Sequence, residues 1–183
     1  TIKILGSDAD TYAQGYFVYD SRKSGSRTTS HLRFGPNPIE APYLVTKAGF
    51  IGIHAWGILE SIDVLTMARE GTTVLLNSPY GPDEVWGKLP RTFQQQVVDK
   101  KLDLWTIDAL SVAREVGLRN RTNTILQTCF FAISGVLPKD EAIERIKASI
   151  QKTYGKKSQK IVDMNHAAVD ASLEHLFQVK VPE

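Results

Sequence analysis

TTVLLNSPYG, at residues 72–81, is the stretch whose pattern decides the fold class. Its first part, Thr72–Asn77, is an apolar run centred on Val-Leu-Leu, which is typical of a strand buried on both faces of a parallel sheet. The loop Asn77–Gly81 follows at the carboxyl end of this strand, where open α/β sheets bind ligands. Asn77 and Ser78 therefore have two interpretations, as ligand contacts or as the cap of a turn.

The residues before this strand complete a strand–helix–strand unit. Leu44–His54 predicts a strand buried on both faces. Gly57–Arg69 predicts a helix, because its Ile and Leu residues repeat at helical spacing and Gly71 follows as a natural helix terminator. A strand, a helix and a strand within about 30 residues form a βαβ unit with parallel strands and a right-handed crossover.

The same alternation continues along the chain and then gives way to helices. The predicted helices lie at about Thr92–Lys100, Ala109–Val116, Thr122–Ser134, Asp140–Lys152 and Lys160–Phe177, with strands at Leu104–Ile107 and Gln178–Pro182. Before residue 44 we expect strands at Ile2–Leu5, Phe17–Ser21 and Thr28–Phe34, and a helix from Ser7 to about Gln14. Together these elements predict a three-layer α/β/α domain with a mixed, mainly parallel sheet and a helical C-terminal third. The hairpin formed by the second and third strands would lie to one side.

Composition narrows the classes of function. The chain has 183 residues, 42% hydrophobic and 23% charged, which suits one globular domain. Its net charge is only +2, from 22 Lys+Arg against 20 Asp+Glu, so nucleic acid is not an expected partner. No apolar stretch reaches the roughly 18 residues of a membrane span, so no membrane partner is expected either.

Cysteine and histidine usage argues against a metal centre. Cys129 is the only cysteine and lies in an apolar run, so it predicts a buried thiol and excludes an iron–sulfur cluster held by this chain alone. The four histidines show no zinc-binding spacing, and His31 is expected to pack within its strand. The residues after Leu5 lack the G-x-G-x-x-G fingerprint, so a nicotinamide cofactor is disfavoured.

The predicted hairpin carries a basic loop. Residues 21–27, SRKSGSR, contain three cations, three serines and one glycine, a composition typical of an exposed turn. Fixed positive charges among hydroxyls and backbone N–H groups suit a phosphate or a carboxylate. A solvated hairpin tip without a ligand is the alternative.

Five segments then carry a family resemblance. YAQGYFVYDSRKSG, TSHLRFGP with PYLV, TTVLLNSPY, TNTILQTCFFAISGVLP and KTYGKKSQKIVDMN follow one another in order. Together they resemble the γ-type domain (domain III) of the single-chain pyruvate:ferredoxin (flavodoxin) oxidoreductases, over nearly the whole chain. The resemblance implies a single domain, residues 1–183, of the pyruvate/ketoisovalerate oxidoreductase catalytic-domain family, belonging to a longer multidomain polypeptide.

The resemblance also implies a chemistry. That family oxidises pyruvate with coenzyme A to acetyl-CoA, carbon dioxide and reduced ferredoxin or flavodoxin, using thiamine diphosphate, magnesium and 4Fe–4S clusters. In the family those cofactors and the electron acceptor are held by other domains of a cytoplasmic, homodimeric parent. For this domain the resemblance implies a contribution to coenzyme A binding and to interdomain packing. The matching positions are Ser21, Arg22, Lys23, Ser24 and Gly25, with Asn123 at the start of the TNTILQT helix as a second group.

Two positions of the basic loop depart from the usual sequence of the family. The family often has Lys where Arg22 stands and Gly where Ser26 stands; the first change keeps the charge and the second stiffens the turn.

No catalytic residue and no metal ligand is assigned to this chain. One alternative is an interdomain scaffold without a ligand. Another is an independent α/β enzyme for a phosphorylated substrate, with Asp20 or Asp108 as acid or base.

Overall fold

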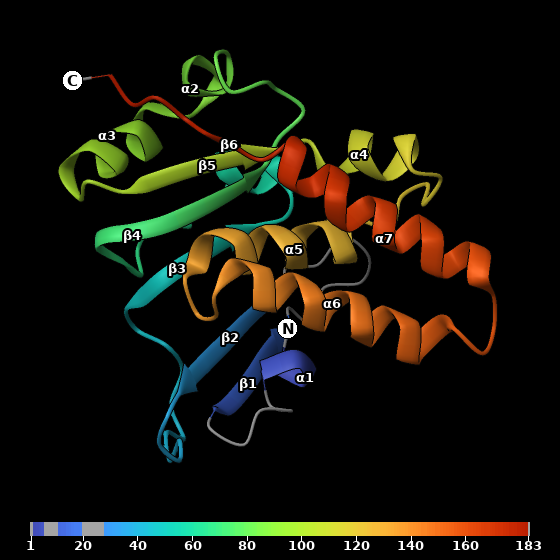
Figure 1. Ribbon diagram of the computed structural model, residues 1–183. Helices are drawn as coiled ribbons and strands as arrows, with labels where there is room; N and C mark the ends of the chain where they lie inside the picture. Colours follow the sequence, from blue (N-terminus) through green and yellow to red (C-terminus); the bar gives the residue numbers. More distant parts are fainter. Residues whose placement is uncertain (1, 6–10, 20–27, 183) are drawn as a thin grey trace. The chain divides into compact units, whose positions relative to one another are not determined.

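The computed structural model describes residues 2–5, 11–19 and 28–182, which divide into two compact units, Thr1–Thr46 and Lys47–Glu183 (Figure 1). Each unit is described by itself.

The first unit is built on a hairpin. Strands β1 (Tyr12–Tyr19) and β2 (Thr28–Gly35) pair antiparallel, with Tyr12 opposite Gly35 and Tyr19 opposite Thr28. The predicted strand pair is therefore confirmed, with β1 beginning earlier than expected. Aromatic residues recur along β1, and such residues favour a pleated strand. His31 is buried in β2, where its Nδ1 accepts a hydrogen bond from the Val45 N–H at 3.2 Å, as expected for a packed histidine.

Two predictions near the N-terminus are wrong. Ile2–Leu5 forms a short helix, α1, in place of a strand. Ile4 and Leu5 are both buried; in a strand, neighbouring side chains point to opposite faces, whereas a helical turn lets both face the same side. Gln14 lies in β1 and not at the end of a helix, and its Nε2 donates to the Ala41 carbonyl at 3.1 Å. Tyr12 and Ala13 also lie in β1, and residues 7–10 of that predicted helix lie outside the described residues.

The second unit contains a four-stranded sheet. Its strands are β3 (Ala48–Ile53), β4 (Ala68–Asn77), β5 (Asp103–Ile107) and β6 (Phe177–Gln178), in the order β3-β4-β5-β6. The first three are parallel, and β6 pairs antiparallel with β5. The prediction of a mixed, mainly parallel sheet is therefore confirmed.

Helices cover both faces of this sheet (Figure 1). One face carries the 3₁₀ turn η1 (Trp56–Glu60) and helices α2 (Val85–Lys88) and α3 (Arg91–Asp99); the other carries α4 (Ala109–Glu115), α5 (Asn123–Ser134) and α7 (Gln159–Glu174), with α6 (Lys139–Tyr154) packed on α5 and α7.

The two faces correspond to two hydrophobic cores. Val74 and Leu76 pack with Phe93 of α3, whereas Leu75 between them packs in the other core with α4 and α5. This alternation along β4 is the period of a strand buried on both faces, so the second unit has three layers, as predicted.

The helix predicted at Gly57–Arg69 is wrong. The segment contains only η1 and turns, and β4 already begins at Ala68. The carboxylate of Asp63 explains the break, because its Oδ1 accepts bonds from the Leu65 N–H at 3.1 Å and the Gln96 Nε2 at 2.9 Å. An Asp side chain that bonds to the nearby backbone competes with helical hydrogen bonds.

The remaining predicted helices match α3 to α7 closely, with one difference at the last. Helix α7 ends at Glu174, because the chain then enters β6, where Phe177 pairs with Thr106 of β5. Of the predicted strand Gln178–Pro182, only Gln178 lies in a strand, as the second residue of β6 (Phe177–Gln178). Among the described residues, none of the helices has the length and hydrophobicity that a membrane span requires.

Candidate functional site

The basic loop predicted to bind coenzyme A lies outside the described residues. Ser21, Arg22, Lys23, Ser24 and Gly25 all belong to the segment 20–27. The strands on either side of it are in register up to Tyr19 and Thr28, so this segment connects two paired strand ends. Its role as a ligand loop stays a prediction.

Asn123 is the first residue of α5 and its side chain is exposed. Thr122 is the N-cap residue of α5 and its side chain makes no capping bond, and no hydrogen bond of the Asn123 side chain is seen among the described residues. The exposed residues Arg119 and Arg121 precede it, and Arg119 adopts a left-handed backbone with φ of 57°. Asn123 therefore offers a free amide beside two cations in the second unit, whereas the basic loop belongs to the first.

The loop after β4 uses its polar side chains for structure. Asn77 Nδ2 donates to the His54 carbonyl at 3.0 Å, and Asn77 Oδ1 accepts from the Ala109 N–H at 3.0 Å. Ser78 is buried and its Oγ accepts from the Tyr80 N–H at 3.0 Å. The turn cap is therefore confirmed for Ser78, whereas Asn77 links the end of β3 to the start of α4 instead of capping the turn.

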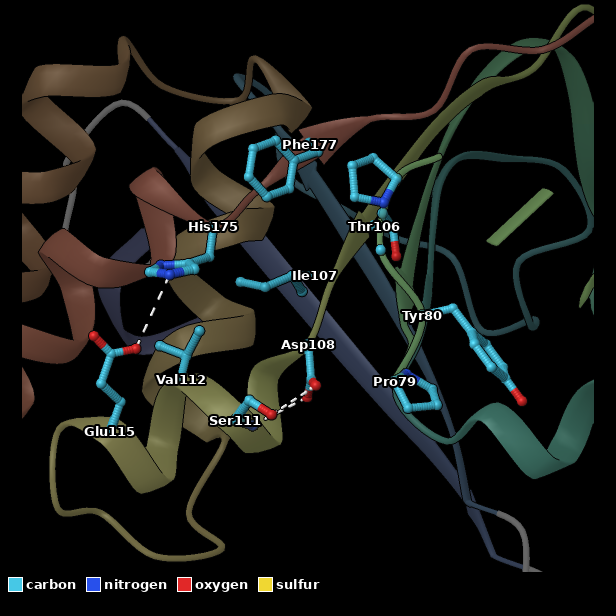
Figure 2. A pocket seen from close by; sticks show the side chains of 12 residues that line it. Pro79, Tyr80, Thr106, Ile107, Asp108, Ser111, Val112, Glu115, His175 and Phe177 are labelled. Atoms are coloured by element: carbon cyan, nitrogen blue, oxygen red, sulfur yellow. Dashed lines mark hydrogen bonds and ion pairs between the residues drawn. The ribbon is translucent and has the colours of Figure 1, made fainter. Parts of the chain in front are cut away.

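A pocket of about 270 Å³ lies at the carboxyl ends of β4 and β5 (Figure 2). After β4 the chain crosses to the face of α2 and α3, and after β5 it crosses to the face of α4. Adjacent parallel strands whose connections leave to opposite faces create a crevice at this edge. Figure 2 shows His175 and Glu115 on one side of the pocket, Pro79 and Tyr80 on the other, and Ile107 between them.

The polar groups of this pocket are mainly hydrogen-bond acceptors. Asp108 caps α4, accepting from the Ser111 N–H at 3.0 Å and the Ser111 Oγ at 2.7 Å. Glu115 Oε2 lies 4.0 Å from His175 Nε2, and the opposite ring nitrogen, Nδ1, lies 2.8 Å from the Ala171 carbonyl. The pocket lining contains no Lys or Arg, so it is a poor site for a phosphate.

No catalytic arrangement emerges among the described residues. The capping bonds occupy both oxygens of Asp108, which accounts for this carboxylate without a catalytic role. Burial raises the pKa of the Cys129 thiol to about 12, so the thiol is unreactive, as expected. The described part of the chain contains no cluster of three or more His, Cys, Asp or Glu that suits a metal ion.

Most of the pocket could not be predicted from the sequence. The strand edge and Asp108 were identified, but Glu115, His175 and Phe177 were not, because they come from α4 and from the segment after α7. The sequence feature that points to the pocket is the carboxyl end of the predicted strand Leu104–Ile107, since ligands favour the sheet edge where the connections of two adjacent strands leave to opposite faces.

Two solved oxidoreductase structures share the fold of this chain. The solved pyruvate oxidoreductase subunit PORC of Thermotoga maritima matches with a TM-score of 0.72 at 18% identity, covering 98% of this chain and 87% of that one. A 2-oxoglutarate:ferredoxin oxidoreductase of Magnetococcus marinus matches with a TM-score of 0.67 at 14% identity, covering 100% of this chain and 30% of that one.

The family follows from the sequence comparison. The family model for pyruvate ferredoxin/flavodoxin oxidoreductase matches residues 2–175, and the chain belongs to that family. It is 59% identical to a Synechocystis protein named as a pyruvate-flavodoxin oxidoreductase and 56% identical to the pyruvate-flavodoxin oxidoreductase of Nostoc. Each match covers 100% of this chain but 15% of the relative, so the chain spans about one seventh of those proteins.

Proposed function

We propose that this chain is the γ-type domain of an enzyme that oxidises pyruvate with coenzyme A and passes the electrons to ferredoxin or flavodoxin. The observation that carries the proposal is the match of the whole of this chain, at 56–59% identity, to part of two pyruvate-flavodoxin oxidoreductases. Thiamine diphosphate, magnesium and the 4Fe–4S clusters would be held by other parts of a homodimeric parent. The single cysteine agrees with this division, because a cubane cluster requires about four thiolates. This chain alone would not turn over substrate.

Within that enzyme, the domain would help to bind coenzyme A. The phosphates of this cofactor need fixed cations and hydrogen-bond donors, which Ser21–Gly25 can supply. Asn123 would add an amide donor, since its side chain is exposed and has no partner among the described residues. The structurally similar 2-oxoglutarate enzyme was solved with coenzyme A bound, which supports testing this role here.

The test is steady-state kinetics of the full-length parent carrying Arg22→Ala and Lys23→Ala. Loss of charge-assisted bonds worth about 1.5 kcal/mol or more should raise the KM for coenzyme A about tenfold, with the KM for pyruvate unchanged. Lys101→Ala is the matched control, because Lys101 is an exposed cation paired with Glu70 on the surface. A wild-type KM for coenzyme A in the double variant would refute the assignment.

The scaffold role rests on a separate observation. Along β1, Tyr16 is 54% exposed and its neighbour Phe17 is 48% exposed, on opposite faces of the strand. A two-stranded sheet with an exposed aromatic side chain on each face is marginally stable alone, so packing against other domains would stabilise it. Hydrogen exchange tests this role: amides of β1 should exchange at least about tenfold more slowly in the parent than in this chain. Equal rates would contradict the packing role.

A further inference from the structure

Strand β3 forms one edge of the four-stranded sheet, but its side chains are those of an inner strand (Figure 1). Phe50 packs on one face, edge-to-face with Phe130 of α5 at 4.9 Å between ring centroids, and Ile53 is buried in the core on the other face. A parallel strand that packs on both faces is typical of the interior of an α/β sheet. Among the described residues, however, no strand pairs with the outer edge of β3.

The two edges of the sheet differ in how they are protected. Natural proteins prevent an edge from pairing with further strands by keeping it short or by placing charged residues and proline there. The β6 edge has these features, because β6 consists of two residues and is followed by Lys180 and Pro182. Strand β3 has six residues, AGFIGI, with no charged residue and no proline. It therefore presents an edge of about 20 Å that can pair with another strand.

Two glycines leave the backbone of β3 accessible. Gly49 and Gly52 are both exposed, and since a glycine has no side chain, the exposed atoms belong to the backbone. A glycine within a strand often marks a place where another backbone approaches closely. The groups available along a strand edge are N–H donors and C=O acceptors, and an added strand satisfies both with its own backbone. A β-strand is therefore the occupant that this edge suits.

We propose that the outer edge of β3 pairs with a β-strand from another part of the parent polypeptide. This chain spans 15% of each of the two relatives described above, so most of such a polypeptide lies outside it and can supply the strand. The alternative occupant is β3 of a second copy, which would fill the edge even in this chain alone. The inference rests on the proposed multidomain parent, but not on coenzyme A binding.

The first test measures amide hydrogen exchange by mass spectrometry in the full-length parent and in this chain. In the parent, the N–H groups of β3 that point away from β4 should exchange at least about tenfold more slowly than in this chain, because a paired strand would bond to them. The matched control is β6 at the protected edge, where the rates should differ by less than about twofold. Equal rates at β3 in the two proteins, or equal slowing at both edges, would overturn the inference. So would slow exchange of β3 that appears in this chain as its concentration rises, since a second copy would then be the occupant.

The second test identifies the strand in the full-length parent. Lys47 is exposed and directly precedes β3, so an amine-reactive diazirine linker attached to it reaches whatever lies along this edge. The linker should join Lys47 to a segment outside residues 1–183, and that segment should itself exchange slowly. Lys47→Arg should abolish this cross-link, whereas Lys139→Arg, an exposed position at the start of α6, should leave it intact. Cross-links of Lys47 that stay within residues 1–183, of the same chain or of a second copy, would overturn the inference. The kinetics of Arg22→Ala/Lys23→Ala report on coenzyme A binding separately.

Discussion

Asn165 on α7 provides the sharpest test of how α5 and α7 are held together. Its side chain is 7% exposed; Oδ1 accepts from Thr124 Oγ1 at 2.8 Å, and Nδ2 donates to the Ile161 carbonyl at 2.9 Å. Asn165→Ala removes both bonds, at about 1 kcal/mol each, and gains about 0.5 kcal/mol of helix propensity. The expected net loss is about 1.5 kcal/mol, or roughly 3–6 °C in the melting temperature.

A double-mutant cycle separates the side-chain bond from other effects. Urea unfolding followed by circular dichroism should give a coupling of about 1 kcal/mol between Asn165→Ala and Thr124→Val. Asn120→Ala is the matched control, because this exposed asparagine should change the stability by less than about 0.5 kcal/mol. A coupling below about 0.3 kcal/mol would refute the reasoning, since the two side chains would then act independently.

Three further predictions concern the thiol, a helix end and a carboxylate. Because burial raises the pKa of Cys129 from 9.0 to about 12, its thiolate at pH 8 is about a thousandfold scarcer than in an ordinary thiol, and maleimide should label it only after denaturation; rapid native labelling contradicts this. Gly135 ends α5 with φ of 69°, so Gly135→Ala should lower the free energy of unfolding in urea by about 1 kcal/mol. Gly87→Ala in α2 is the control, because the added Cβ meets open space and should not lower the stability. Equal losses in the two variants would refute the backbone explanation. The pKa of Asp63 is lowered, first by the hydrogen bond from Gln96, so its folded-state pKa lies below its unfolded value. The contribution of Asp63 to stability is then present above about pH 4 and is lost as the pH falls through the folded-state pKa. The urea midpoint should therefore fall between about pH 5 and 3, and Gln96→Ala should make this fall smaller. An unchanged fall in Gln96→Ala would argue against the hydrogen bond.

Local patterns were sufficient for most of the second unit. The apolar run around Val74–Leu76 and the helical periods of α3 to α7 report burial directly, because each depends on residues close in sequence. The failure at Gly57–Arg69 has the opposite cause. There the period is helical, but Asp63 bonds to the Leu65 N–H and to Gln96, and that tertiary bond is not visible in a local pattern.

The two candidate sites, the basic loop and the pocket, also differ in how far a local sequence pattern could predict them. The basic loop at residues 21–27 was recognised from composition alone, and its role stays a prediction. The pocket could not be predicted as a set, because Tyr80, Glu115 and His175 come from separate connections. Only the strand order and the faces taken by those connections bring them to one edge.

The basic loop and the pocket differ in charge, and this difference determines which ligands suit each of them. The loop SRKSGSR carries three cations, whereas the pocket carries the carboxylates of Asp108 and Glu115 and no Lys or Arg. Two unit charges 4 Å apart interact by about 1 kcal/mol in water and about 4 kcal/mol at a protein surface. A phosphate that suits the cations of the loop is therefore a poor ligand for the carboxylates of the pocket. The composition of the loop therefore favours the anionic cofactor proposed above, whereas the acidic lining of the pocket disfavours it.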